Sequence, residues 1–418
     1  MSVTVPESRA ESSQPQSGMA RTFNSLRVRE FRYLSGGTLS ANFADWANRI
    51  GTGWLVFVLT DSAAQLGAYA FTSGIIGLGS TPAAGMLADR LPRARVVIAA
   101  SLASVVLASV MAVLVLSGAI ALWHVYILGS ISAVTNAAGL PARQALVHDV
   151  TTPELLPNAV ALNSLVMNVA RLIGPPLFGV LAAVNDAAPF LAIIALQLID
   201  AAAIRPLGLK ARPRAGGPPR NPLRELWDGL RYVFSDRTLL SLFLIMFTAS
   251  IVAYPYLSLF PVFAEEVLHA GSVGYGLLFA MAGMGSIIGL VLLANLSGMR
   301  RRGPVMLGCY FIHLTGIAVY SQMEHLWLAM LSLFLGGIAI GMGFALYYTL
   351  FQLHVRDDMR GRALAIAQMA NQFFTVGALP MGLTIGLVGI QHGILLHVIA
   401  AALIILVVTM VRPEWRRL

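Results

Sequence analysis

The chain has 418 residues, of which 57% are hydrophobic and only 11% are charged. A water-soluble protein of this size needs more polar surface than that, so the composition indicates a membrane protein. The formal net charge of +9 would suit nucleic acid binding, but the distribution of the basic residues along the chain explains this charge better. We therefore expect no nucleic acid partner.

Apolar stretches long enough to cross a bilayer recur along the chain. A spanning helix needs about 20 mostly apolar residues to cross about 30 Å of hydrocarbon. We predict twelve such helices, over residues 32–60, 65–88, 96–117, 121–142, 156–184, 187–206, 238–263, 273–297, 303–323, 326–352, 361–388 and 390–411. A β-barrel would alternate in polarity, whereas the stretch from Val96 to Leu116 is apolar on all sides. The expected fold class is all-α integral membrane protein.

Basic residues gather on one side of the predicted membrane. They precede the first span, follow the even-numbered spans and end the chain, whereas the loops near Asp61, Asp186 and Glu324 contain no Lys or Arg. The positive-inside rule then places both termini in the cytoplasm. We expect a multi-pass protein of the cytoplasmic (inner) membrane.

One long hydrophilic connection divides the twelve spans into two sets of six. Its first part, residues 212–222, is rich in Pro, Gly and Arg and is typical of a flexible linker. Its second part has Leu226, Trp227 and Leu230 at helical spacing, which predicts an amphipathic helix at the membrane surface. This helix either couples the two halves or simply packs at the interface.

Weak internal similarity at a shift of about 204 residues indicates a duplication. It sets Pro176 opposite Pro380. We therefore predict a disordered N-terminal tail (1–30), a six-helix bundle (31–206), the linker (207–237), a pseudo-symmetric second six-helix bundle (238–411) and a short C-terminal tail (412–418). Two six-helix halves around a site at the midplane is a known transporter plan.

The loop between the second and third spans resembles the signature loop of the major facilitator superfamily. Residues 85–95 match its pattern at Gly85, Leu87, Asp89, Arg90 and Arg93, with Pro92 where a glycine is usual. The resemblance implies that Gly85, Asp89, Arg90 and Arg93 belong to a conformational latch on the cytoplasmic side. A plain solvated turn is the alternative.

Residues 170–179 resemble the Gly-Pro motif of the superfamily's exporters. Pro175 within a helix removes a backbone hydrogen bond, and Gly174 and Gly179 allow a neighbouring helix to approach closely. A kinked packing helix without directional meaning is the alternative. From about residue 25 to 412, the chain is similar to the branch that includes enterobactin exporters and macrolide efflux pumps. It departs from many drug/proton antiporters in having no arginine between Trp123 and Leu140, in the middle of the fourth span.

Ionisable side chains within the spans are candidates for function, because each costs about 2.5–3.5 kcal/mol to insert. Asp45 and Arg49 lie one helical turn apart in the first span, and Asn42 shares their face. Either the two charges neutralise each other, or Asp45 changes protonation while Arg49 tunes it. Arg171 has no evident partner in its own helix and would pair with Asp45 or with a substrate anion.

Uncharged polar side chains complete the predicted substrate cavity, and such a lining suits amphipathic organic molecules. They are Asn42, Ser164, Asn168, Tyr254, Tyr347, Tyr348, Gln368, Asn371 and Gln372. Ordinary packing between helices is the alternative for each of them. We expect Asp200 to pair with Arg205 near the membrane surface, and His313 and His397 to be packing residues with no metal site.

These features predict a secondary transporter that works as a monomer, with no catalytic residues and no cofactor beyond a proton gradient. It would export a small organic molecule, such as a drug or siderophore, by alternating access between the halves. An importer, a facilitator or a lipid-handling transporter of the same fold is the alternative. A membrane enzyme is disfavoured, because the chain has no His-Glu-x-x-His or Gly-x-Ser-x-Gly motif.

Overall fold

The computed structural model describes residues 24–209, 222–296 and 301–417. Its first half holds six long helices: α2 (Arg29–Thr60), α3 (Ala63–Arg90), α4 (Arg93–Leu116), α5 (Leu122–Val150), α6 (Leu156–Val184) and α7 (Ala188–Ile204). A short 3-10 helix, η1 (Asn24–Arg27), precedes them, and the buried Ser25 hydroxyl donates to Asn158. Residues 24–30, which we assigned to a disordered tail, are therefore structured, and residues 1–23 lie outside the described part.

The second half begins with the amphipathic helix α8 (Pro222–Ser235). The main elements that follow are α9 (Arg237–Thr248), η3 (Ala249–Ala253), η4 (Tyr254–Leu259), α10 (Phe260–Glu266), α11 (Gly271–Ala294), α12 (Arg302–Ser321), α13 (Leu326–His354), α14 (Arg360–Gln372), α15 (Phe374–Val388) and α16 (Ile390–Val411). Short 3-10 turns are η2 (Arg205–Leu209), η5 (Asp357–Met359) and η6 (Pro413–Arg417). Each predicted span coincides with a helical segment.

Ten of these segments are long and apolar enough to cross a membrane, counted over the described residues. The two remaining spans are α2 and α3, so the structure supports the predicted twelve only in part. Polar side chains such as Asp45 and Arg49 make α2 less apolar than the others. The fold is all-helical throughout the described ranges.

Two predicted spans are interrupted helices. The span from α9 to α10 passes through a π turn and a 3-10 turn, where Pro255 and Pro261 lack the backbone N–H that a continuous helix needs. A second break separates α14 from α15 at Phe373. Hydropathy does not resolve such breaks, because the apolar composition continues through them.

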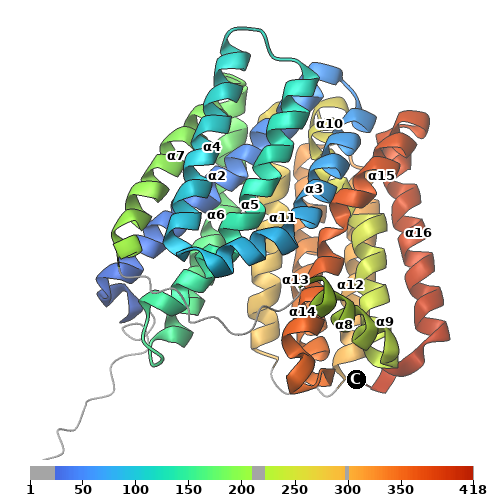
Figure 1. The fold of residues 1–418 in the computed structure, drawn as a ribbon. Coiled ribbons are helices and arrows are strands. Elements are labelled where there is room, and N and C mark those ends of the chain that lie inside the picture. Colours follow the sequence, from blue (N-terminus) through green and yellow to red (C-terminus); the bar gives the residue numbers. More distant parts are fainter. Residues whose placement is uncertain (1–23, 210–221, 297–300, 418) are drawn as a thin grey trace, which may run out of the picture.

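The halves lie side by side, with α2–α7 forming one bundle and α9–α16 the other (Figure 1). They meet along two helix pairs, α3 against α15 and α6 against α11. Glycines allow the backbones to touch: a Cβ on Gly67 would collide with the carbonyl of Ala378, and one on Gly276 with the carbonyl of Pro175. We call these two contacts the junction.

The junction lies toward one end of the bundles. It involves the start of α3, the end of α6, the start of α11 and the first half of α15, which lie remote from α8 (Figure 1). Ser272 adds a hydrogen bond to the carbonyl of Gly179 there, at 2.9 Å. We call the opposite end, where α8 lies, the linker side.

Helix α8 packs against α14 on the linker side. Arg362 lies 3.6 Å from both Glu225 and Asp228, and the Arg356 amide donates to the hydroxyl of Tyr232 at 3.1 Å. Trp227 is 67% exposed on the outer face of α8. A helix is present where the sequence predicts the amphipathic one, and the stretch 212–222, predicted to be flexible, lies almost entirely outside the described residues.

A buried ion pair ties α5 to α7 inside the first half. Arg143 donates to both carboxylate oxygens of Asp200, at 2.8 and 2.6 Å, and the Ser101 hydroxyl donates to the same carboxylate at 2.5 Å. Asp200 is fully buried and the Arg143 side chain is 11% exposed. The predicted pairing of Asp200 with Arg205 is wrong, because Arg205 is exposed and α5 continues past the predicted end at residue 142, which brings Arg143 inside.

Breaking this pair should destabilise the first half. Asp200→Leu leaves the Arg143 charge buried alone, which costs about 3–5 kcal/mol. We expect a clearly lower Tm of the purified protein in detergent, and partial recovery in the double variant Arg143→Leu/Asp200→Leu, which buries no charge. A single variant as stable as the wild type would contradict the role of the pair.

Candidate functional site

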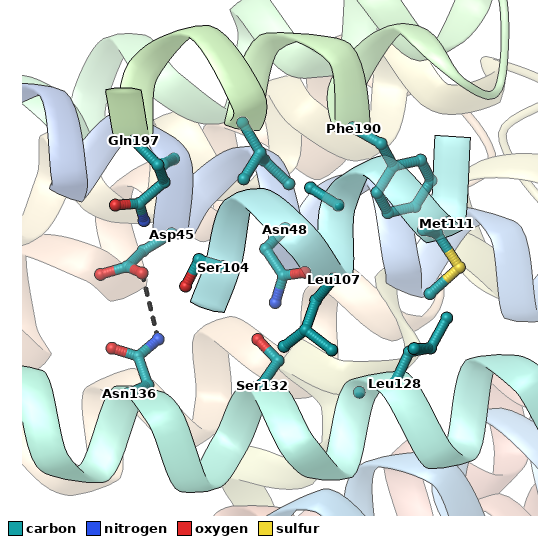
Figure 2. Close-up of a pocket in the computed structure, with 14 residues that line it drawn as sticks. Asp45, Asn48, Ser104, Leu107, Met111, Leu128, Ser132, Asn136, Phe190 and Gln197 are labelled. Atoms are coloured by element: carbon teal, nitrogen blue, oxygen red, sulfur yellow. Dashed lines mark hydrogen bonds between the residues drawn. The ribbon is translucent and has the colours of Figure 1, made fainter. Parts of the chain in front are cut away.

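A polar pocket lies inside the first half, between α2, α4, α5 and α7 (Figure 2). Its polar lining comes from six side chains, while apolar residues close the far end. The polar residues are Asp45, Asn48, Ser104, Ser132, Asn136 and Gln197. The pocket is thus enclosed by helices of one half and differs from a cavity between the halves.

Asp45 points into this pocket and bonds with α5. The side-chain amide of Asn136 donates to the Asp45 carboxylate at 3.0 Å (Figure 2). Pairing of Asp45 with Arg49 or with Arg171 was one of the predicted alternatives, and neither ion pair forms within the described residues. Asp45 therefore has an uncharged partner.

Arg49 lies one helical turn beyond Asp45 on α2, at the boundary with the second half. Its guanidinium group stacks over Trp46, 5.5 Å from the ring centroid, and its carbonyl accepts a 3.4 Å hydrogen bond from Tyr275 of α11. Trp46 in turn packs edge-on against Phe279, also of α11. The side chain of Arg49 is exposed and forms no ion pair within the described chain.

Arg171 of α6 lies at the same boundary between the halves. Its aliphatic stem covers Gly283 of α11, where an added Cβ would sit 3.4 Å from the Arg171 Cγ. The side chain is exposed, and no ion pair to it is found among the described residues. The two arginines thus bring two positive charges without carboxylate partners to the place where the halves meet.

The Gly-Pro motif forms part of the junction. Gly174 contacts Trp46 of α2, the Pro175 carbonyl faces Gly276, and the Gly179 carbonyl accepts from Ser272. The sequence predicted the close approach of a neighbouring helix at these glycines, and the structure places α2 beside Gly174 and α11 beside Gly179.

The other predicted cavity residues divide into two groups. Ser164, Gln368 and Gln372 are exposed, while Asn42, Asn168, Tyr348 and Asn371 are half-buried. Asn42 and Asn168 bond with backbone carbonyls of their own helices.

Tyr254 and Tyr347 were predicted to line the substrate cavity, but both are buried in the core of the second half. Tyr254 packs edge-on against His313 and Phe344, and Tyr347 against Tyr348. In this conformation their rings do not reach an open surface. Helical periodicity places such residues on one face of a helix without saying what that face contacts.

The predicted latch is described only in part. The side chains of Asp89 and Arg90 and the surroundings of Gly85 lie outside the described residues. Arg93 donates to Asp149 at 2.6 Å and to the Ala145 carbonyl at 3.3 Å, both near the end of α5. Arg93 therefore fastens the start of α4 to α5 within the first half.

Arg143, Asn136 and Gln197 were not among the site residues predicted from the sequence. One signal was present: Ser132, Asn136 and Arg143 recur at intervals of four and seven residues and so share one face of a helix. Gln197 is a lone polar residue in an apolar helix, and only the packing of α7 against α2 and α4 gives it a polar environment.

Residues 20–416 match the model of the transmembrane secretion effector family. The chain belongs to this family, and the fold and the match together define a transporter of the major facilitator superfamily, in its siderophore and drug efflux branch. It is accordingly a multi-pass membrane protein that handles a small molecule and is not an enzyme.

Characterised relatives carry transport names. The chain is 26% identical to the staphyloferrin A transporter of Staphylococcus aureus over 364 residues, which cover 86% of this chain and 90% of the relative. It is 26% identical to the enterobactin exporter EntS of Citrobacter koseri, covering 73% of each chain. It is 22% identical to macrolide efflux protein A of Streptococcus pyogenes, covering 75% of this chain and 79% of the relative.

Solved structures share the fold at low sequence identity. The nucleoside transporter NupG matches with a TM-score of 0.70 and 12% identity, covering 91% of this chain and 98% of NupG. A bacterial homologue of ferroportin in an inward-facing state matches with a TM-score of 0.65 and 17% identity, covering 94% of this chain and 99% of that one. The major facilitator fold predicted from the sequence is confirmed.

Proposed function

We propose that this protein exports a small organic anion of the siderophore class from the cytoplasm, coupled to proton influx. The observation that carries the proposal is the pair of arginines, Arg49 and Arg171, which lack carboxylate partners in the described chain and meet where the two halves join. Guanidinium groups bind carboxylates and other anionic oxygens in a bidentate manner. A cargo with several such oxygens would neutralise both.

The names of the relatives favour export of such a cargo. A staphyloferrin transporter and an enterobactin exporter stand among them, beside a macrolide efflux protein. Because a macrolide is a different kind of molecule, family membership alone does not select the cargo. The charge at the boundary favours an anion over a neutral drug.

The arrangement of the halves supports alternating access. Their backbone contacts lie toward the end remote from α8, so this conformation is closed at that end and would admit a cargo from the linker side. The positive-inside rule makes the linker side cytoplasmic. Separating the junction while closing the linker side would then release the cargo outside.

Asp45 is the proposed proton carrier. A carboxylate within the membrane is a common element of proton relays, and Asp45 has only an amide as its partner. Since Asp45 and Arg49 lie on one helix, α2 would connect protonation in the pocket to the charge at the boundary.

Export should depend on Arg171. Arg171→Ala removes one charged partner of the cargo, and such bonds contribute about 1.5–3 kcal/mol, so we expect the KM for an anionic siderophore to rise roughly tenfold or more. The measurement is uptake into inverted vesicles. Arg205→Ala, which removes an exposed arginine away from the boundary, is the matched control. Equal transport by all three proteins would contradict the anion site.

Proton coupling should depend on Asp45. In inverted vesicles with a pH-sensitive dye, adding cargo to the wild type should cause protons to move in the direction opposite to the cargo. Asp45→Asn should abolish that proton movement. Cargo uptake without any linked proton movement in the wild type would exclude the antiport proposal and favour a facilitator.

Alternating access predicts a response at the linker side to a change at the junction. Gly276→Val inserts bulk against Pro175 and should favour the conformation in which the junction is open. Spin labels at positions 148 and 354, which are exposed at the linker-side ends of α5 and α13, should then move closer together. Cys309→Ser provides the cysteine-free background.

The control is Gly386→Val, because a Cβ at that position meets no atom within 4 Å. It should leave the distance between the labels unchanged. An unchanged or longer distance in Gly276→Val would count against rigid movement of the halves.

A further inference from the structure

The pocket beside Asp45 contains a buried polar group without a partner. Gln197 is 7% exposed, and its side-chain oxygen accepts no hydrogen bond from the described residues. Figure 2 shows its amide at the Asp45 end of the pocket, with the amide nitrogen on the side of Asp45. A buried acceptor left unpaired costs about 1–3 kcal/mol, so an occupant that contacts this oxygen would be stabilising.

The remaining polar side chains offer more oxygens to the same space. Asn136 donates its NH₂ group to Asp45, which leaves the amide oxygen of Asn136 available. The hydroxyls of Ser104 and Ser132 face the pocket from α4 and α5 (Figure 2). Oxygen ligands from carboxylate, amide and hydroxyl groups are those that hard metal cations prefer.

The size of the pocket selects a small occupant. About 30 Å³ can be reached by a water-sized sphere. One water needs about 10–15 Å³ on that measure, so the space holds one ion, alone or with a water molecule. An organic cargo does not fit.

The charges around the pocket select a monovalent ion. Asp200 is neutralised by Arg143, and the guanidinium group of Arg49 lies over Trp46. Asp45 is the one carboxylate of the lining, and within the described residues it forms no ion pair, although Arg143 and Arg49 act on it electrostatically from farther away. One positive charge balances it, whereas a divalent ion would leave a buried excess charge.

We propose that this pocket binds Na⁺, with Asp45 and Gln197 as its main ligands and Ser104, Ser132 and Asn136 completing the set. A proton needs only a single acceptor, whereas a pocket lined by carboxylate, amide and hydroxyl groups from four helices suits a metal cation. The inference deepens the proposed function, on which it rests for the role of Asp45, by assigning a second ion that competes with the proton for this carboxylate.

The pocket offers a route for the ion. Asn136, at one end of the polar lining, is exposed, whereas Gln197 is buried. An ion would pass Asn136 and displace its amide from Asp45 before it reaches the oxygen of Gln197. Access is required of any functional ion site.

The test measures sodium binding by the purified, full-length protein without cargo. Tm is recorded while NaCl replaces choline chloride at constant ionic strength, and retained ²²Na⁺ is counted. A ligand that binds only the folded state raises stability with the logarithm of its concentration, so we expect a sodium-specific rise of about 1–3 °C per tenfold increase. We also expect retention of ²²Na⁺ by the wild type.

Two variants locate the site. Gln197→Leu keeps the size of the side chain and should weaken sodium binding roughly tenfold or more. Ser104→Ala removes only a hydroxyl, and we expect the sodium-dependent rise in Tm to be smaller in this variant as well. It tests the site even if Gln197→Leu does not fold. Ser109→Ala is the matched control, because Ser109 lies on α4 outside the pocket lining and bonds with the Val105 carbonyl.

Absence of both the sodium-specific shift and ²²Na⁺ retention in the wild type would overturn the sodium site, as would equal binding by the wild type and both variants. Neither result would bear on the proposal of proton-coupled export, which the vesicle assay tests separately. Sodium binding with no export of any cargo would leave the ion site standing and remove the proposed function.

Discussion

The need of each membrane-buried charge for a partner governs the first half of this protein. Arg143 and Asp200 satisfy each other and, with Ser101, hold α4, α5 and α7 together. Asp45 has an amide partner, and Arg49 and Arg171 have no carboxylate partner in the described chain. Because unpaired charges in hydrocarbon are costly, they are retained where an ion, a cargo or water can reach them.

The packing of the halves gives these charges their positions. Glycines in α3, α6, α11 and α15 let the backbones touch at the junction, and Trp46 fills the space beside Gly174. Helix α2 takes part in both environments, with Asp45 inside the first half and Arg49 beside α11. A change in the charge of Asp45 in the pocket would therefore occur about one helical turn from Arg49, at the boundary that would bind a cargo.

The helices and the superfamily were predictable from the sequence, because long apolar stretches and the motifs around Gly85 and Gly174 are local signals. The partners of the charges were not. The predicted end of the fourth span at residue 142 excluded Arg143 from the membrane, and Asp200 was then assigned to the nearest arginine in sequence. The pocket could not be predicted, since Gln197, Ser104 and Asn136 come from three helices that meet only in the fold. Tyr254 and Tyr347 were placed on a cavity because periodicity does not identify the neighbour of a helix face.

The proposed cargo site requires that Arg171 faces water and not lipid. The direct measurement is the reaction of an Arg171→Cys variant, in the Cys309→Ser background, with a membrane-impermeant thiol reagent added from each side of the membrane. We predict labelling from the linker side and protection by an anionic cargo. A cysteine at position 171 that stays unreactive from both sides would contradict the proposed site for the cargo.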